Sequence, residues 1–259
     1  FLGEGYAISQ VVMSRNAIGF VAILVFVMMR GANLAILHPG RPGLLALRTL
    51  FSLGAAFAFF TSLRFLPLAD AFAIAFASPL FVTALSVPLL GEQVGIRRWS
   101  AVVLGFGGVL VVMQPSGEAF RLEALLALCA ALCHAIAMLL GRKMTRDMTT
   151  TAIMFWPSLG VALVTLFMMP SQWQTPSLPD LGVFFLMGVV GTIGMSLITQ
   201  GYRYAPAAVI APFDYSSLLW ASLLGWIIWQ DIPGPNVWLG SAILIASGLY
   251  ILYRETRRH

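Results

Sequence analysis

Nine long apolar runs constrain this chain more than any other feature of its sequence. They lie near residues 12–29, 44–65, 69–90, 99–113, 123–141, 151–169, 181–202, 207–229 and 236–253. About 20 apolar residues cross the ~30 Å hydrocarbon core of a bilayer as a helix. Apolar residues make up 59% of the 259 residues and charged residues only 10%, which argues against a water-soluble fold. The sequence therefore predicts an all-α, polytopic membrane protein.

The basic residues indicate how these helices are oriented. If the runs alternate across the bilayer, twelve basic residues fall on one side and three on the other. The larger group is Arg30, Arg41, Arg48, Arg97, Arg98, Arg142, Lys143, Arg146, Arg203, Arg254, Arg257 and Arg258. Because cytoplasmic loops carry the excess of Lys and Arg, we expect a cytoplasmic C-terminus in a bacterial-type inner membrane. The bases are scattered through short loops without interleaved aromatic residues, so no nucleic-acid partner is expected.

A shift of 139 positions aligns the chain with itself. It pairs Arg64 with Arg203, Pro67 with Pro206, Phe76 with Tyr215, Ser78 with Ser217, Glu92 with Asp231, and Trp99 with Trp238. An internal repeat of this kind indicates two structural copies. The shift moves each helix by five runs, an odd number, so the copies are expected to have opposite orientations, as in many secondary transporters.

The repeat also predicts a helix that precedes this sequence. The counterpart of the run at 123–141 would end at about residue 2. We therefore expect ten helices in the intact protein, arranged as an inverted repeat of two five-helix bundles, with nine complete in this chain. The first repeat would cover residues 1–114 and the second residues 115–259.

Three stretches resemble the EamA-type members of the drug/metabolite transporter superfamily. They are LRFLPLADAFAIAFASPLFVTALSVPLLGE at 63–92, RRWSAVVLGFGGVLVV at 97–112 and YRYAPAAVIAPFDYSSLLWASLLGW at 202–226. The resemblance covers essentially the whole chain and implies two inverted five-helix bundles around a central cavity. It implies that the lining runs are 44–65, 69–90, 123–141, 181–202 and 207–229. Members of this family carry amino acids, nucleotide-like metabolites, vitamins and drugs.

Asp214 is the main candidate site residue. It lies about eight positions into the run at 207–229, within the segment Ala-Pro-Phe-Asp-Tyr-Ser-Ser. A carboxylate at this depth is costly and usually belongs to a substrate or proton path. It suits proton exchange or pairing with a cationic group of a substrate. A fixed ion pair that only positions helices, for example with Arg48, is the alternative. The matching residue in the first copy is Ala75, so the acid acts in one copy only.

The other candidate residues lie in the same run or in runs expected to line the cavity. Pro79 and Pro212 remove backbone hydrogen bonds inside spanning runs, which either frees carbonyls to line a cavity or only kinks the helix. The remaining candidates for substrate binding are Tyr215, Ser217, Phe76, Ser78, His134, Trp220 and Gln200. Each also has a structural explanation, because hydroxyls can bond to their own helix, rings can pack, and an amide can cap a helix end.

These observations favour a secondary transporter that moves a small polar metabolite by alternating access, coupled to protons or to exchange. The acid points to an amino acid or a related amine or nucleoside-like compound, such as an S-adenosylmethionine-like metabolite. An intramembrane enzyme and a non-cycling channel or assembly subunit are the alternatives. The sequence has no His-Glu-x-x-His, Gly-x-Gly-Asp or Gly-x-x-x-x-Gly-Lys motif, so no cofactor, metal site or direct ATP drive is expected. The expected partners are a small-molecule substrate and the lipid bilayer, in a monomer or a homodimer.

Overall fold

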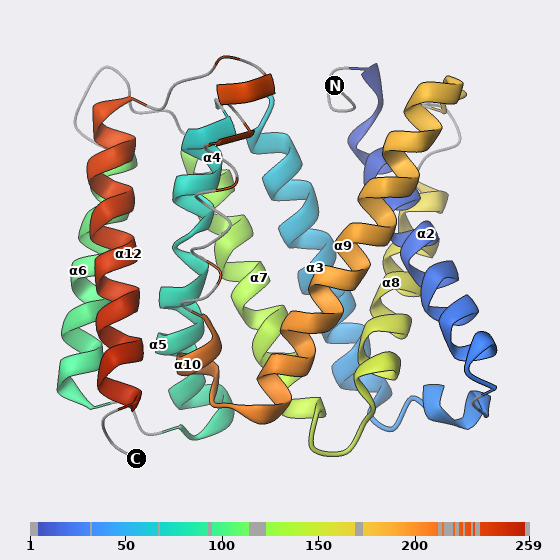
Figure 1. Cartoon of the computed structure of the whole chain (residues 1–259), viewed down its shortest axis with the longest axis horizontal. Coiled ribbons are helices and arrows are strands. Elements are labelled where there is room, and N and C mark those ends of the chain that lie inside the picture. Colours follow the sequence, from blue (N-terminus) through green and yellow to red (C-terminus); the bar gives the residue numbers. More distant parts are fainter. Residues whose placement is uncertain are drawn as a thin grey trace. The chain divides into compact units, whose positions relative to one another are not determined.

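The structure is a computed structural model that describes residues 5–31, 33–66, 68–92, 95–113, 123–168, 173–211, 214, 220, 223–224, 226–228, 230 and 234–256. Every regular element in these ranges is helical, which confirms the predicted all-α class (Figure 1). The elements are α2 (Ile8–Met29), η1 (Leu34–Leu37), α3 (Pro42–Ser62), α4 (Leu68–Ala75), α5 (Ser78–Leu90), α6 (Ile96–Met113), α7 (Ala124–Met144), α8 (Thr150–Phe167), α9 (Leu178–Tyr204), α10 (Ala207–Ile210) and α12 (Pro235–Thr256).

Six of the described segments are long and apolar enough to cross a bilayer. They are Ile8–Met29, Pro42–Ser62, Asp70–Leu90, Ala124–Met144, Thr150–Phe167 and Leu178–Tyr204. α6 contains a shorter apolar stretch, Trp99–Val111, and much of the run at 207–229 lies outside the described residues. The chain is thus a multi-pass membrane protein, while the total of nine spans stays a prediction.

The chain divides into two compact units, each built from two separate segments. Unit 1 is Phe1–Phe60 with Leu140–Tyr204, and unit 2 is Thr61–Leu139 with Ala205–His259. Under the 139-residue shift, α2 corresponds to α8 and α3 to α9, all largely in unit 1. α6 corresponds to α12, and both lie in unit 2. Helices of the first half therefore share a unit with their counterparts, while the repeat boundary near residue 114 stays a prediction.

In unit 1, α2 packs against both α8 and α9. The Tyr6 hydroxyl, just before α2, donates a hydrogen bond of 2.6 Å to Asp180 in the first turn of α9. The N-termini of α2 and α9 therefore lie at the same end of the unit. At the opposite end, Thr149 caps α8 by accepting from the Ala152 amide and also donates to the Ile36 carbonyl. α8 is thus antiparallel to α2.

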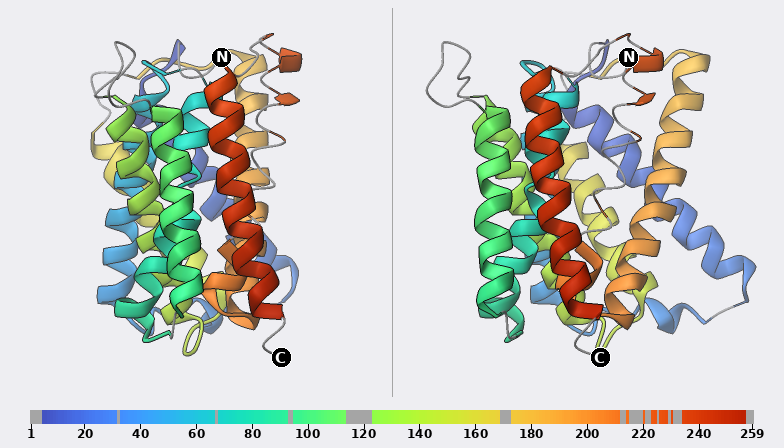
Figure 2. Two further views of the ribbon diagram at one scale, coloured as in Figure 1. Left: turned by 90° about the vertical axis from the view of Figure 1, so that its left-hand side faces the viewer. Right: turned by 60° about the vertical axis from the view of Figure 1, so that its left-hand side comes forward.

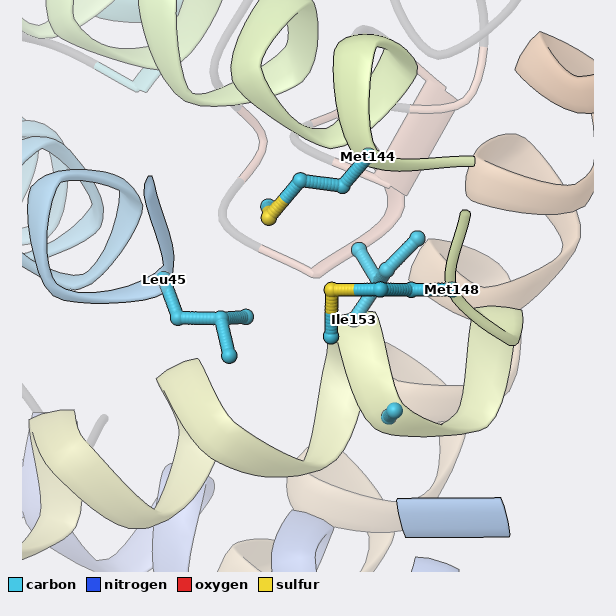
Figure 3. Close-up of a cluster of buried hydrophobic side chains, with 5 residues drawn as sticks. Leu45, Met144, Met148 and Ile153 are labelled. Atoms are coloured by element: carbon cyan, nitrogen blue, oxygen red, sulfur yellow. The ribbon is translucent and has the colours of Figure 1, made fainter. Parts of the chain in front are cut away.

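A small apolar cluster lies at this second end of unit 1 (Figure 3). Leu45 from α3 and Ile153 from α8 pack with Met144, the last residue of α7, and with Met148 in the following turn. These side chains bring three helices together, since each is almost fully buried. The cluster packs the N-terminal ends of α3 and α8 against the C-terminal end of α7.

In unit 2, α6 and α12 run antiparallel and side by side (Figures 1 and 2). Gly105 faces Ser247, whereas Gly108, one turn later on α6, faces Gly240 and Ile243 on an earlier turn of α12. Glycines at these positions let the two backbones approach closely, which is a common way for helices to associate in lipid.

Candidate functional site

The apolar run at 69–90 is broken within the membrane-length segment. α4 ends at Ala75 and α5 begins at Ser78. Pro79 is the second residue of α5, and a proline ring clashes with the carbonyl four residues earlier, here that of Ala75. The break lies inside unit 2 rather than at its surface, because Phe76 and Ala77 are both buried. Two short helices thus replace one continuous helix.

Ser78 places a buried hydroxyl at this break. The residue is 6% exposed, and its Oγ has no hydrogen-bond partner among the described residues. The other two hydroxyls of α5 bond to their own helix, Thr83 to the Pro79 carbonyl at 3.0 Å and Ser86 to the Thr83 carbonyl at 2.9 Å. A buried polar group without a partner costs about 1–3 kcal/mol. Ser78 is thus the hydroxyl of α5 that its own helix does not satisfy.

α10 packs against α5 and α12 (Figure 1). Gly91 ends α5 in the left-handed conformation with φ of 70°, which favours glycine. This turn positions Glu92, whose carboxylate accepts a hydrogen bond of 3.4 Å from the Ala207 amide at the start of α10. Asp214 is half-buried and follows the last residue of α10 by four positions. Asp214 therefore follows α10, which packs against α5, the second of the two short helices.

The candidate residues from the sequence fall into three groups. Phe76, Ser78, Pro79, His134, Asp214 and Trp220 belong to unit 2. Within it, His134 is half-buried on α7, and the Trp220 side chain is 63% exposed. Pro212, Tyr215 and Ser217 lie outside the described residues. Gln200 alone belongs to unit 1.

The Gln200 side chain links two neighbours at the second end of unit 1. The Thr150 hydroxyl donates to Gln200 Oε1, and Gln200 Nε2 donates to the Tyr204 hydroxyl at 3.0 Å. These bonds join the start of α8 to the last turns of α9. Arg48 and Asp214 belong to different units, so the proposed ion pair between them stays a prediction.

Arg48 is the feature that sequence reasoning underestimated. It lies near the start of α3, where an arginine is normally expected to reach the lipid headgroups and follow the positive-inside bias. In unit 1 its side chain is instead buried, and it contacts Met154 of α8, which also accepts a hydrogen bond of 3.3 Å from Thr199 of α9. The only signal in the sequence was a charged residue inside an apolar run, the same signal that singled out Asp214.

Comparison with known proteins identifies a family for this chain. The model of the EamA-like transporter family matches residues 2–114 and 121–254. A solved structure that is 16% identical in sequence matches with a TM-score of 0.71 and covers 97% of this chain and 89% of the other. At this identity the match concerns the fold alone.

Three of the similar curated proteins are bacterial transporters with different substrates. The S-adenosylmethionine uptake transporter of Rickettsia bellii is 26% identical over 257 residues, which cover 99% of this chain and 88% of that protein. The riboflavin transporter of Vibrio cholerae is 29% identical, covering 74% of this chain and 65% of that protein. The pseudopaline exporter CntI of Pseudomonas aeruginosa is 28% identical, covering 94% of this chain and 83% of that protein.

Proposed function

The chain belongs to the EamA-like transporter family, as a transporter of small metabolites and not an enzyme, and on that premise we propose how it works. It is a secondary transporter that carries a small polar metabolite with an amino or other cationic group by alternating access. The driving force is a proton gradient or exchange of substrates. The intramembrane enzyme considered from the sequence is set aside by this family membership. The non-cycling channel is the alternative that the experiment below distinguishes from a carrier.

The observation that carries this proposal is the broken helix and its counterpart. In the first copy the chain leaves the helix after Ala75, and the 139-residue shift places Asp214 at the equivalent position. Discontinuous helices form the substrate and ion sites of many secondary transporters, because they expose backbone groups near the middle of the bilayer. A carboxylate at such a position supports binding of a cationic group or a proton.

The packing of equivalent helices supports the proposed inverted repeat of residues 1–114 and 115–259. α6 and α12 correspond to each other and pack antiparallel within unit 2. α2 and α8 correspond in the same way and pack antiparallel within unit 1. Two copies related by a two-fold axis in the membrane plane produce pairs of this kind.

The basic residues Arg41 and Arg142 at one end of unit 1 support a cytoplasmic location of that end. Arg41 forms an ion pair with Asp147, and the Arg142 guanidinium donates to the Tyr202 carbonyl near the end of α9. The second end of unit 1, marked by these residues, is the cytoplasmic face in our proposal, since basic residues gather there. The alternation of runs then places the C-terminus on the same side.

The names of the relatives support a substrate with a cationic or nucleoside-like group. The match to S-adenosylmethionine uptake transporters extends over 99% of this chain. S-adenosylmethionine carries an amino group and a sulfonium, both of which an acid such as Asp214 would attract. The riboflavin and pseudopaline relatives indicate that substrates vary within the family, so the substrate class is tested directly.

Transport by the purified protein in proteoliposomes tests this function. The probes are labelled S-adenosylmethionine, lysine and riboflavin, each measured with and without unlabelled compound on the opposite side. We expect saturable uptake and counter-exchange of at least one probe. Asp214→Asn should reduce uptake roughly 30-fold or more, because removing one partner of a buried charge pair costs about 2–5 kcal/mol.

Asp147→Asn is the matched control, since it makes the same chemical change at an exposed residue. Its ion pair with Arg41 is worth about 0–1 kcal/mol, so transport should persist. Undiminished uptake by Asp214→Asn would remove the role given to this acid. Flux that rises linearly with concentration and shows no counter-exchange would indicate a channel instead.

A further inference from the structure

Arg48 is a buried cation in an apolar environment. Its side chain belongs to α3 and is 3% exposed. Nη2 lies 3.7 Å from the Met154 sulfur on α8, and Nη1 has no hydrogen-bond partner among the described residues. The guanidinium lies against the bare backbone of Gly141 on α7, where an added Cβ would overlap Nη1 and lie 2.9 Å from Cζ. α3, α8 and the last residues of α7, which belong to unit 1, thus enclose this group.

The described residues of unit 1 supply no counter-ion to Arg48. A guanidinium stays protonated in proteins and has five N–H donors, whereas a thioether sulfur is only a weak acceptor. Burying an ion without a counter-ion costs several kcal/mol. The described acids of this unit are engaged elsewhere, Asp147 with Arg41 and Asp180 with Tyr6 and Ser177. An anionic partner for this guanidinium would remove that cost.

The described neighbours of Arg48 in unit 1 add no second free cation. Arg142 follows Gly141 on α7, but its guanidinium donates to the Tyr202 carbonyl. Met154 and the buried Thr199 hydroxyl, which donates to the Met154 sulfur at 3.3 Å, are neutral. A single guanidinium fork binds a carboxylate through two parallel hydrogen bonds, and one carboxylate neutralises it.

We propose that Arg48 binds the carboxylate of the transported metabolite. This inference rests on the proposed function and deepens it, because it restricts the substrate to small molecules that carry a carboxylate. α-Amino acids and their derivatives are the simplest such molecules. The neutral Met154 and Thr199 position the guanidinium rather than bind the ligand.

Matched pairs of probes test this assignment. S-adenosylmethionine and its decarboxylated form differ only in the carboxylate, as do lysine and cadaverine. Half-saturation of binding to the purified full chain is measured for each by thermal shift and by inhibition of uptake. For wild type we expect the carboxylated member of at least one pair to bind about 10- to 100-fold more tightly, the range for hydrogen bonds to charged groups.

Variants of Arg48 show whether this preference comes from the guanidinium. Arg48→Met should abolish the preference, and Arg48→Lys, which keeps the charge but loses the planar fork, should retain part of it. Arg41→Met is the matched control, because Arg41 is partly exposed and paired with Asp147. That variant should keep the full preference. A wild-type protein that prefers neither carboxylated probe overturns the inference, and continued uptake of the decarboxylated amines would leave the proposed function intact.

A measurement without ligand separates a substrate anchor from an internal ion pair. If Arg48 awaits a substrate carboxylate, Arg48→Met removes an unpaired buried charge and leaves the melting temperature of the ligand-free protein unchanged or higher. If Arg48 is instead held by the Asp214 carboxylate, Arg48→Met lowers the melting temperature, and adding Asp214→Asn restores it. The second outcome overturns the inference even if transport is intact.

Discussion

Replacement of Gly108 by leucine should separate α6 from α12. A Cβ at Gly108 would lie 2.8 Å from the Gly240 carbonyl oxygen and 3.1 Å from Cβ and Cγ2 of Ile243. Carbon atoms pack best at about 3.5–4.0 Å, so even the first added carbon requires a shift of roughly half an ångström. The backbone oxygen of Gly240 cannot rotate away as a side chain would. The longer leucine side chain increases the required shift.

Gly107 is a matched control on the same helix. It is exposed, and a Cβ there would meet nothing within 4 Å. A glycine-to-leucine change raises helix propensity by up to about 1 kcal/mol at either position. Because this gain is common to both variants, the difference between them reports the steric cost at the contact. Forced overpacking costs about 1–3 kcal/mol.

The assay is the melting temperature of the purified protein in detergent. A change of 1 kcal/mol corresponds to roughly 2–4 °C for a chain of this size class. Gly108→Leu should therefore melt about 2 to 12 °C below Gly107→Leu, with Gly108→Ala in between. Equal melting temperatures for the two leucine variants would refute the close approach of α6 and α12 at Gly108.

Two further predictions concern the first end of unit 1. Gln10→Ala should lower stability by about 1–3 kcal/mol, because the buried Gln10 amide exchanges hydrogen bonds of 2.6 and 3.1 Å with the Gln174 backbone. Gln174→Ala keeps that backbone and should have no effect on thermal unfolding; a loss equal to that of Gln10→Ala would contradict the assignment. The hydrogen bond to the Asp180 carboxylate raises the pKa of Tyr6 above its ordinary value. The stabilisation of the fold by this hydrogen bond is therefore present at neutral pH and lost as the pH rises past about 10. Melting curves between about pH 8 and 11 should show this loss in wild type and a weaker one in Tyr6→Phe, while identical curves would exclude it.

The spans of most helices follow closely from the apolar runs. The run at 151–169 corresponds to α8 at Thr150–Phe167, and the run at 181–202 to α9 at Leu178–Tyr204. Helix hydrogen bonds are local, and in lipid every backbone polar group must be satisfied within the segment. The length of an apolar run therefore predicts the helix well. The break between α4 and α5 is also local, because Pro79 acts on a carbonyl four residues earlier.

The candidate site followed less readily from the sequence. Asp214 was identifiable because a carboxylate deep in an apolar run has few structural explanations. Arg48 was not identifiable in this way, since an arginine near a helix end is ordinarily explained by contact with the lipid headgroups. Its burial depends on Gly141 and Met154, which lie about a hundred positions further along the chain. No local pattern contains that information.

The sequence alone determined that this chain is a set of membrane-spanning helices, and its internal repeat indicated two related halves. Only the tertiary structure decided that α2 packs with α8 and α6 with α12, so that both units draw on both halves. The physical reason is that lipid provides no hydrophobic drive between helices, and association depends on the fit of small residues such as Gly108 against a distant backbone. That fit exists only once the helices are assembled, and so does the buried environment of Arg48.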